Sequence, residues 1–148
     1  NAVGVGTTML LHCDVVVASP SATFSMPFAS LGLVPEAGSS FLFPALVGYQ
    51  RAAKIFFTGE SFGADTALEM GLIAEINSDA LASATKIAQH IAEQPPQAII
   101  NTKALLKARN HESVAAVMKA EFEIFAMALQ SDEAMEAFMK FMAKKGKS

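Results

Sequence analysis

The chain has 148 residues, of which 52% are apolar and 17% are charged, and its 11 Lys and Arg against 14 Asp and Glu leave a formal net charge of -3. A charge this close to neutral excludes the strongly basic surface by which proteins bind nucleic acid. The apolar runs are interrupted by Gly, Ser, Pro or Asp before they reach the roughly 20 residues of a transmembrane helix, so no membrane span is expected.

Charged side chains are distributed very unevenly along the chain. Residues 1–50 contain two acids, Asp14 and Glu36, and no Lys or Arg. A stretch so poor in charge is expected to be mostly buried, in a core or against other protein. Its pattern predicts a short helix over 7–12, a buried strand over 13–18, a second strand over 23–26, and a loop over 32–38 before a helix capped by Ser39 or Ser40.

The second half of the chain is predominantly helical. Helices are predicted over 50–57 and 64–70, the latter ended by Gly71, and a short strand is predicted over 72–76. From residue 79 onward the periodicity predicts four consecutive helices, over 79–93, 96–109, 112–129 and 132–145. The change in composition at residues 77–78 marks the expected domain boundary.

Glu36 is the first candidate for chemistry. It lies on a loop flanked by Val34, Pro35 and Ala37, and apolar surroundings destabilise a charged carboxylate, which favours proton transfer. Two interpretations stay open: a general base, or a solvated turn residue that favours the following helix through its dipole. Asp14 begins an apolar strand, and we expect it to accept backbone hydrogen bonds in a turn.

The turn Gly4-Val5-Gly6 precedes the first predicted helix. A glycine turn that leads into a helix leaves backbone N–H groups near Val5 and Gly6 with the helix dipole behind them, and such donors suit an oxyanion. A purely structural tight turn is the alternative. The turn does not match a dinucleotide-binding fingerprint, because the third glycine is absent.

Other kinds of site have no support in the sequence. His12, His90 and His111 are far apart and the adjacent pair His12-Cys13 lacks metal-ligand spacing, so no metal is expected and His12 is interpreted as a helix-end or core residue. No serine lies in a nucleophile-elbow pattern, which argues against a Ser-His-Asp hydrolase. The single cysteine, Cys13, allows no disulfide within the chain and fits a reducing compartment.

Several motifs together are similar to those of one known family. They are the Ala2-Val3-Gly4-Val5-Gly6 turn, His12-Cys13-Asp14 with the valine run after it, Ala22-Thr23-Phe24, Pro27-Phe28, Leu31-Gly32-Leu33-Val34-Pro35-Glu36-Ala37-Gly38-Ser39-Ser40, Leu46-Val47-Gly48 and Thr58-Gly59-Glu60. On these residues the chain resembles the enoyl-CoA hydratase/isomerase, or crotonase, superfamily over nearly its whole length. Pro27-Phe28 followed by Pro35-Glu36 looks like the peroxisomal-type branch of 3-enoyl-CoA to 2-enoyl-CoA isomerases.

The resemblance implies an acyl-CoA reaction. Hydratases of the family use two glutamates at positions that match Thr8 and Phe28, so hydration is not expected here. In the isomerase branch a single glutamate, matching Glu36, is the catalytic base that removes a proton from C2 of a 3-enoyl-CoA and returns it at C4. The backbone N–H of Val5 matches one oxyanion donor for the thioester enolate.

The resemblance also implies a fold and an assembly. The expected fold class is mixed α/β, with residues 1–76 as the C-terminal part of a β-β-α spiral core and residues 77–148 as an all-helical domain that forms a homo-oligomer, a trimer or hexamer. Lys140, Lys144 and Lys145 match a basic region near the CoA phosphates, for which a solvated basic helix end is the alternative. The acyl-CoA substrate carries the coenzyme A, and no separate cofactor, nucleic acid or membrane partner is expected.

Three further expectations concern the protein as a whole. The second oxyanion donor of the family comes from an upstream segment, so we expect these 148 residues to be a fragment with little activity alone. A bacterial cytoplasmic location is expected, because neither a signal peptide nor a Ser-Lys-Leu end is visible. Another acyl-CoA reaction of the superfamily, or a non-catalytic binding or assembly module, is the alternative to an isomerase.

Overall fold

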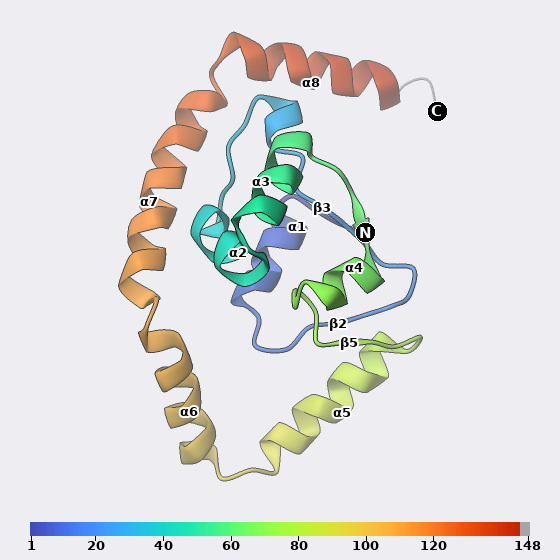
Figure 1. Cartoon of the computed structure of the whole chain (residues 1–148), viewed down its shortest axis with the longest axis vertical. Helices are drawn as coiled ribbons and strands as arrows, with labels where there is room; N and C mark the ends of the chain where they lie inside the picture. The colour runs from blue at the N-terminus through green and yellow to red at the C-terminus, as the bar shows by residue number, and fades with distance from the viewer. Residues whose placement is uncertain (146–148) are drawn as a thin grey trace.

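The computed structural model describes the chain over residues 1–145 and its side chains over residues 1–143. Its elements are short in the first half and longer in the second (Figure 1). The predicted mixed α/β class is confirmed. In chain order, with η for a 3-10 helix, the elements are β1 (Ala2–Val3), α1 (Val5–Thr8), η1 (Met9–His12), β2 (Val17–Ala18), β3 (Thr23–Ser25), η2 (Ala29–Leu31), α2 (Ser39–Val47), α3 (Tyr49–Thr58), β4 (Phe62–Gly63), α4 (Ala64–Glu69), β5 (Glu75–Ile76), α5 (Ala80–Ala92), α6 (Pro96–Ala108), α7 (His111–Ala128) and α8 (Asp132–Lys145).

Two small sheets organise the first half. β3 pairs in parallel with β1 on one side and antiparallel with β4 on the other. β2 pairs in parallel with β5, and Ala18 lies opposite Ile76. Two parallel strands must be joined by a long crossover connection. Here α1 and η1 lie in the connection from β1 to β3, and α2, α3 and α4 lie in the connection from β2 to β5.

The hydrophobic core lies between these sheets and the helices α2, α3 and α4. Phe24 stacks on Phe62 with ring centroids 5.6 Å apart, and Phe43 meets Phe56 edge-on at 5.5 Å. All but one of the buried hydrophobic side chains of the described chain lie within residues 18–73. Residues 1–50 supply a third of these side chains, and Val3, Val5 and Met9 of the same stretch are more than half exposed, so this charge-poor stretch is not mostly buried within the described chain.

The four helices α5 to α8 follow one another round the outside of this core (Figure 1). α5 contacts β2, α7 contacts α2, and α8 contacts η2. α5 and α6 bury no residue, and Leu81, Leu105 and Leu106 are 79%, 78% and 75% exposed. No helix in the described part of the chain is both long and apolar enough to cross a membrane. The division of the chain at residues 76–77 stays a prediction.

The predicted helices from residue 39 onward agree with the structure, whereas the helix predicted over 7–12 is observed as α1 (Val5–Thr8) followed by the 3-10 helix η1 (Met9–His12), and the predicted strands are too long. Of residues 13–18 only Val17–Ala18 pair with another strand, and of residues 72–76 only Glu75–Ile76 do. Both segments are apolar because their side chains pack against other residues. A strand also needs a neighbouring backbone to pair with, and in each segment only two residues have such a neighbour. β1, β4 and η2 are not predicted because such short elements have no periodicity.

The prediction for Asp14 is wrong. Its carboxylate accepts no backbone hydrogen bond within the described residues and instead pairs with two lysines of α6, at 2.5 Å from Lys103 Nζ and 3.7 Å from Lys107 Nζ. The hydrogen bond from Lys103 is the main reason why the pKa of Asp14 lies below its ordinary value. Sequence patterns do not show this pairing because Lys103 follows 89 residues later.

Replacing Asp14 by Asn is expected to lower the free energy of unfolding at pH 7 by less than about 1 kcal/mol, because the ion pairs are exposed. Because the pKa of Asp14 is lower in the folded state, its ionised form stabilises the protein at pH values above the unfolded-state pKa of about 3.9. This stabilisation is lost as the pH falls through the folded-state pKa. Urea unfolding at pH 7 and at about pH 3 measures the effect, with Asp65→Asn at another exposed acid as the control. A difference that persists at low pH would contradict the pairing.

Candidate active site

The first component of the site is the turn between β1 and α1. Gly4 has φ 57° and ψ -119°, a conformation that only glycine adopts readily, and its N–H donates to Ser25 O at 2.9 Å. The N–H groups of Thr7 and Thr8 both donate back to Gly4 O. The N–H of Val5, at the start of α1, has no acceptor among residues 1–145. It is therefore available to an oxygen of a ligand.

The second component is a tight turn that carries Glu36. Ser39 N–H donates to Glu36 O at 3.1 Å and closes a turn of four residues. Its two central residues, Ala37 and Gly38, have φ of 59° and 72°, as in a type I′ turn. A left-handed φ costs a residue with a Cβ about 1 to 2 kcal/mol. Ala37 is therefore strained and must be held in place by its surroundings.

Thr8 joins the two components. Its hydroxyl donates to Glu36 Oε1 at 2.5 Å, and Thr8 lies one helical turn after Val5 on α1. Thr8 is fully buried, whereas Glu36 is half-buried. Glu36 Oε2 has no hydrogen-bond partner within the described chain. One carboxylate oxygen is thus anchored, and the other is left to accept a proton.

His12 supports the turn from the end of η1. Its Nε2 lies 2.7 Å from Ala37 O, and since a carbonyl oxygen only accepts, the ring nitrogen donates. The side chain is exposed, so His12 is a helix-end residue and not a core residue. Its contact with the turn of Glu36 is not predicted from the sequence, because β2, β3 and η2 lie between the two segments.

The predicted capping of α2 by Ser39 or Ser40 is wrong. The N-cap of α2 is Gly38, which has no side chain, and Ser39 Oγ is buried without a hydrogen-bond partner in the described structure. The acceptor comes from α7: Glu121 Oε2 receives Gly38 N–H at 2.6 Å, and Oε1 receives Ser40 N–H at 2.8 Å. The role of Glu121 is not predicted from the sequence, in which its one signal is an acid on an otherwise apolar helix face.

The structure brings together Val5, Thr8 and Glu36, but it does not bring Lys140 of α8 to them. Lys140 is exposed, and its Nζ lies 3.5 Å from Glu136 Oε2. The side chains of Lys144 and Lys145 lie outside the described residues. A contact of these lysines with phosphates stays a prediction.

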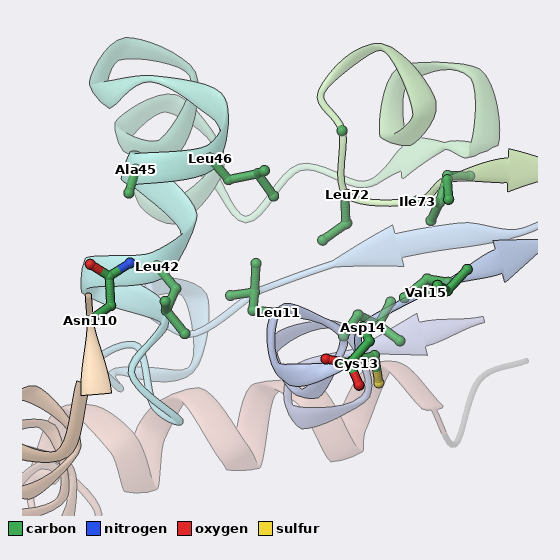
Figure 2. A pocket seen from close by; sticks show the side chains of 14 residues that line it. Leu11, Cys13, Asp14, Val15, Leu42, Ala45, Leu46, Leu72, Ile73 and Asn110 are labelled. Atoms are coloured by element: carbon green, nitrogen blue, oxygen red, sulfur yellow. The ribbon is translucent and has the colours of Figure 1, made fainter. Parts of the chain in front are cut away.

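A groove of about 370 Å³ opens between η1, α2 and the residues before β5 (Figure 2). Neither Val5 nor Glu36 lines it, so the groove does not contain the candidate chemistry. Its wall is mostly apolar, with leucines from three separate segments: Leu11, Leu42, Leu46 and Leu72.

Comparison with known proteins gives consistent matches. A family model described as enoyl-CoA hydratase/isomerase matches residues 1–147. Enoyl-CoA delta isomerase 2 of Rattus norvegicus is 33% identical over 149 residues, which are 99% of this chain and 38% of that protein. The 2,3-dehydroadipyl-CoA hydratase of Escherichia coli K12 is 31% identical over 146 residues, 97% of this chain and 57% of that protein. The chain thus spans only part of the length of these relatives.

A solved structure agrees with these sequence matches. The crystal structure of an enoyl-CoA hydratase/isomerase from Pseudoalteromonas atlantica T6c superposes with a TM-score of 0.93 at 43% sequence identity. The match covers 97% of this chain and 58% of that one. The two proteins therefore share their fold over nearly all of the present chain.

Proposed function

Because the chain belongs to the enoyl-CoA hydratase/isomerase family, we propose that the complete protein moves the double bond of a fatty 3-enoyl-CoA to the 2-position. The observation that carries this proposal is the hydrogen bond from Thr8 to Glu36. It fixes one half-buried carboxylate against the short helix whose first N–H, on Val5, is available to a ligand. A base and an oxyanion donor held together in this way suit a proton shift along an acyl thioester.

The proposed reaction uses Glu36 twice. Its Oε2 removes a proton from C2, and the electron pair of the broken C–H bond forms a dienolate whose thioester oxygen carries the negative charge. The N–H of Val5 donates to this oxygen. Glu36 then returns the proton to C4, where the pair of the C3–C4 double bond forms the new C–H bond. A C2–C3 double bond and the carbonyl result, and no water or co-reactant is consumed.

Hydration of a 2-enoyl-CoA has less support. It requires groups that activate water and deliver a proton, and the two positions that match the hydratase glutamates hold Thr8 and Phe28. Thr8 donates its hydroxyl to Glu36, and Phe28 is buried in the core. Neither side chain exchanges protons as a carboxylate does, so one base remains.

Two assays on the complete protein distinguish the two activities. One follows the formation of conjugated 2-enoyl-CoA from 3-enoyl-CoA, and the other follows the loss of 2-enoyl-CoA by hydration. We expect kcat/KM for isomerisation to exceed that for hydration by at least about 100-fold, the contribution of one positioned acid or base. Equal rates, or no isomerisation over a range of chain lengths, would contradict the proposal and favour another acyl-CoA reaction or a binding module.

Replacing Thr8 by Val tests the anchor of the base. Valine has nearly the same shape but no hydroxyl, so Glu36 Oε1 loses its donor. We expect kcat for isomerisation to fall about tenfold with little change in KM, because a hydrogen bond to a charged group contributes about 1.5 to 3 kcal/mol. Steady-state kinetics measure the effect. The control is Thr85→Val on α5, whose hydroxyl bonds to Leu81 O; equal kcat in both variants would make the anchor dispensable.

A further inference from the structure

Glu121 is the one charged side chain among the described residues that is buried, with 6% of its surface exposed. No Lys, Arg or His forms an ion pair with it in the described part of the chain. Burial of a carboxylate is costly unless hydrogen bonds replace its hydration. Here the N–H groups of Gly38 and Ser40 do so, at 2.6 and 2.8 Å, at the positive end of α2.

One face of α7 brings the carboxylate to this place. Val114, Met118, Glu121 and Phe125 recur at helical spacing and so share a face. A Cβ on Gly38 would lie 3.3 Å from Met118 Cγ and 3.3 Å from Val114 Cγ1. Phe125 packs against the hydrophobic core. α7 therefore lies directly on the N-terminus of α2, and Glu121 is the charged residue in this contact.

The hydrogen bond from Gly38 N–H matters because this amide belongs to the peptide group that joins Ala37 to Gly38. The oxygen of the same peptide group, Ala37 O, accepts from His12 Nε2 at 2.7 Å, while its N–H donates to Glu121 Oε2 at 2.6 Å. The peptide plane is thus held at both ends. It is also the central peptide of the turn that begins with Glu36, between two residues with left-handed φ.

We propose that Glu121 is a positioning residue for the base: it holds the Ala37–Gly38 peptide in place and so keeps the Glu36 carboxylate against Thr8. Without this acceptor the strained turn can open, because rotation of Ala37 to an ordinary negative φ removes the cost of its left-handed conformation. The backbone at Glu36 then changes direction. The inference rests on the proposed function, in which Glu36 removes the proton from C2.

The test compares Glu121→Gln and Glu121→Asp with Glu123→Gln in the complete protein. Gln keeps the shape of the side chain but turns an amide NH2 toward one of the two donors, and Asp withdraws the carboxylate by one methylene. Both are expected to lower kcat for isomerisation by about 10- to 100-fold and to leave KM within about threefold, as a small displacement of a catalytic group does. Glu123 is exposed on the same helix, so its variant is expected to keep the kcat of the unaltered protein.

A purely structural role gives a different result. It would lower the melting temperature and leave kcat per folded molecule equal to that of Glu123→Gln, and this outcome would overturn the proposal. If Glu121→Gln does not fold, Glu121→Asp decides. If neither variant folds, Glu121 is a residue required for folding, and the positioning role is wrong.

Amide hydrogen exchange gives a readout that does not depend on activity. Loss of the acceptor is expected to accelerate exchange at Gly38 and Ser40 by at least about tenfold in Glu121→Gln relative to Glu123→Gln. Unchanged exchange would contradict the proposal. Failure of the proposed function is recognised separately, because the unaltered protein would then lack isomerase activity while the exchange rates still report whether Glu121 holds the turn.

Discussion

Replacement of Glu36 by Gln in the complete protein is expected to lower kcat for isomerisation by about 10³-fold, within the contribution of a positioned acid or base. The amide has the size of the carboxylate, and its oxygen can still accept from Thr8 Oγ1, so the turn is kept. The ability to take up and return a proton is lost. KM is expected to stay within about threefold, because this loss acts on the chemical step. Initial-rate kinetics with 3-enoyl-CoA measure both constants.

Two further variants complete this experiment. Glu36→Asp keeps the acid but withdraws it by one methylene, and we expect a smaller loss of about 10- to 100-fold. Glu93→Gln, at an exposed acid just after α5, is expected to be fully active. If Glu36→Gln retained more than about a tenth of the original kcat, far above the residual activity expected without the base, Glu36 would not be the base.

Replacing Gly32 by Ala is expected to lower the free energy of unfolding by about 3 kcal/mol. Gly32 has φ 68° at the end of η2, and an added Cβ would lie 2.8 Å from Ala134 N and 3.0 Å from Glu133 C. These are backbone atoms at the start of α8, so no rotation of a side chain can relieve the overlap. The left-handed conformation adds its own cost.

Gly71→Ala is the matched control for this substitution. Gly71 also has a positive φ, 76°, but its added Cβ would lie 3.7 Å from Leu46 Cδ1, an ordinary contact. We expect the control to lose only the conformational cost of about 1 to 2 kcal/mol. Urea unfolding at equal protein concentrations measures both variants. Equal losses would mean that α8 moves aside without cost.

The long helices are predictable from the sequence because an apolar pattern repeats over several of their turns. The helix predicted over 96–109 is observed as Pro96–Ala108, and that predicted over 132–145 as Asp132–Lys145. Strand pairing over two residues has no such repeat and depends on a distant partner. The same reason explains why the contact of Asp14 is not predicted. Its partner Lys103 lies 89 residues away, and nothing in the residues next to Asp14 indicates this contact.

The candidate site is predictable where its motifs are local. The glycine turn before Val5 and the loop that carries Glu36 are both visible in the sequence, and the family resemblance is confirmed by the match over residues 1–147. Contacts between segments are not visible. Thr8 bonds to Glu36 across 28 residues, and Glu121 bonds to Gly38 across 83. Contacts at such separations produce no sequence pattern. From the sequence, Thr8 is therefore notable only because it occupies a position at which hydratases of the family have a glutamate.

The separation of Gly38 from Glu121 has a consequence for synthesis of the protein. A ribosome that adds about 5 to 20 residues per second needs about 4 to 17 seconds for the 83 residues between them. Once residue 73 has been added, the core residues 18–73 can pack, whereas the Gly38 and Ser40 amides still have no carboxylate to accept their hydrogen bonds. In the proposed role of Glu121, the turn that carries Glu36 acquires its final geometry only when α7 has emerged and docked on a core that has formed before it.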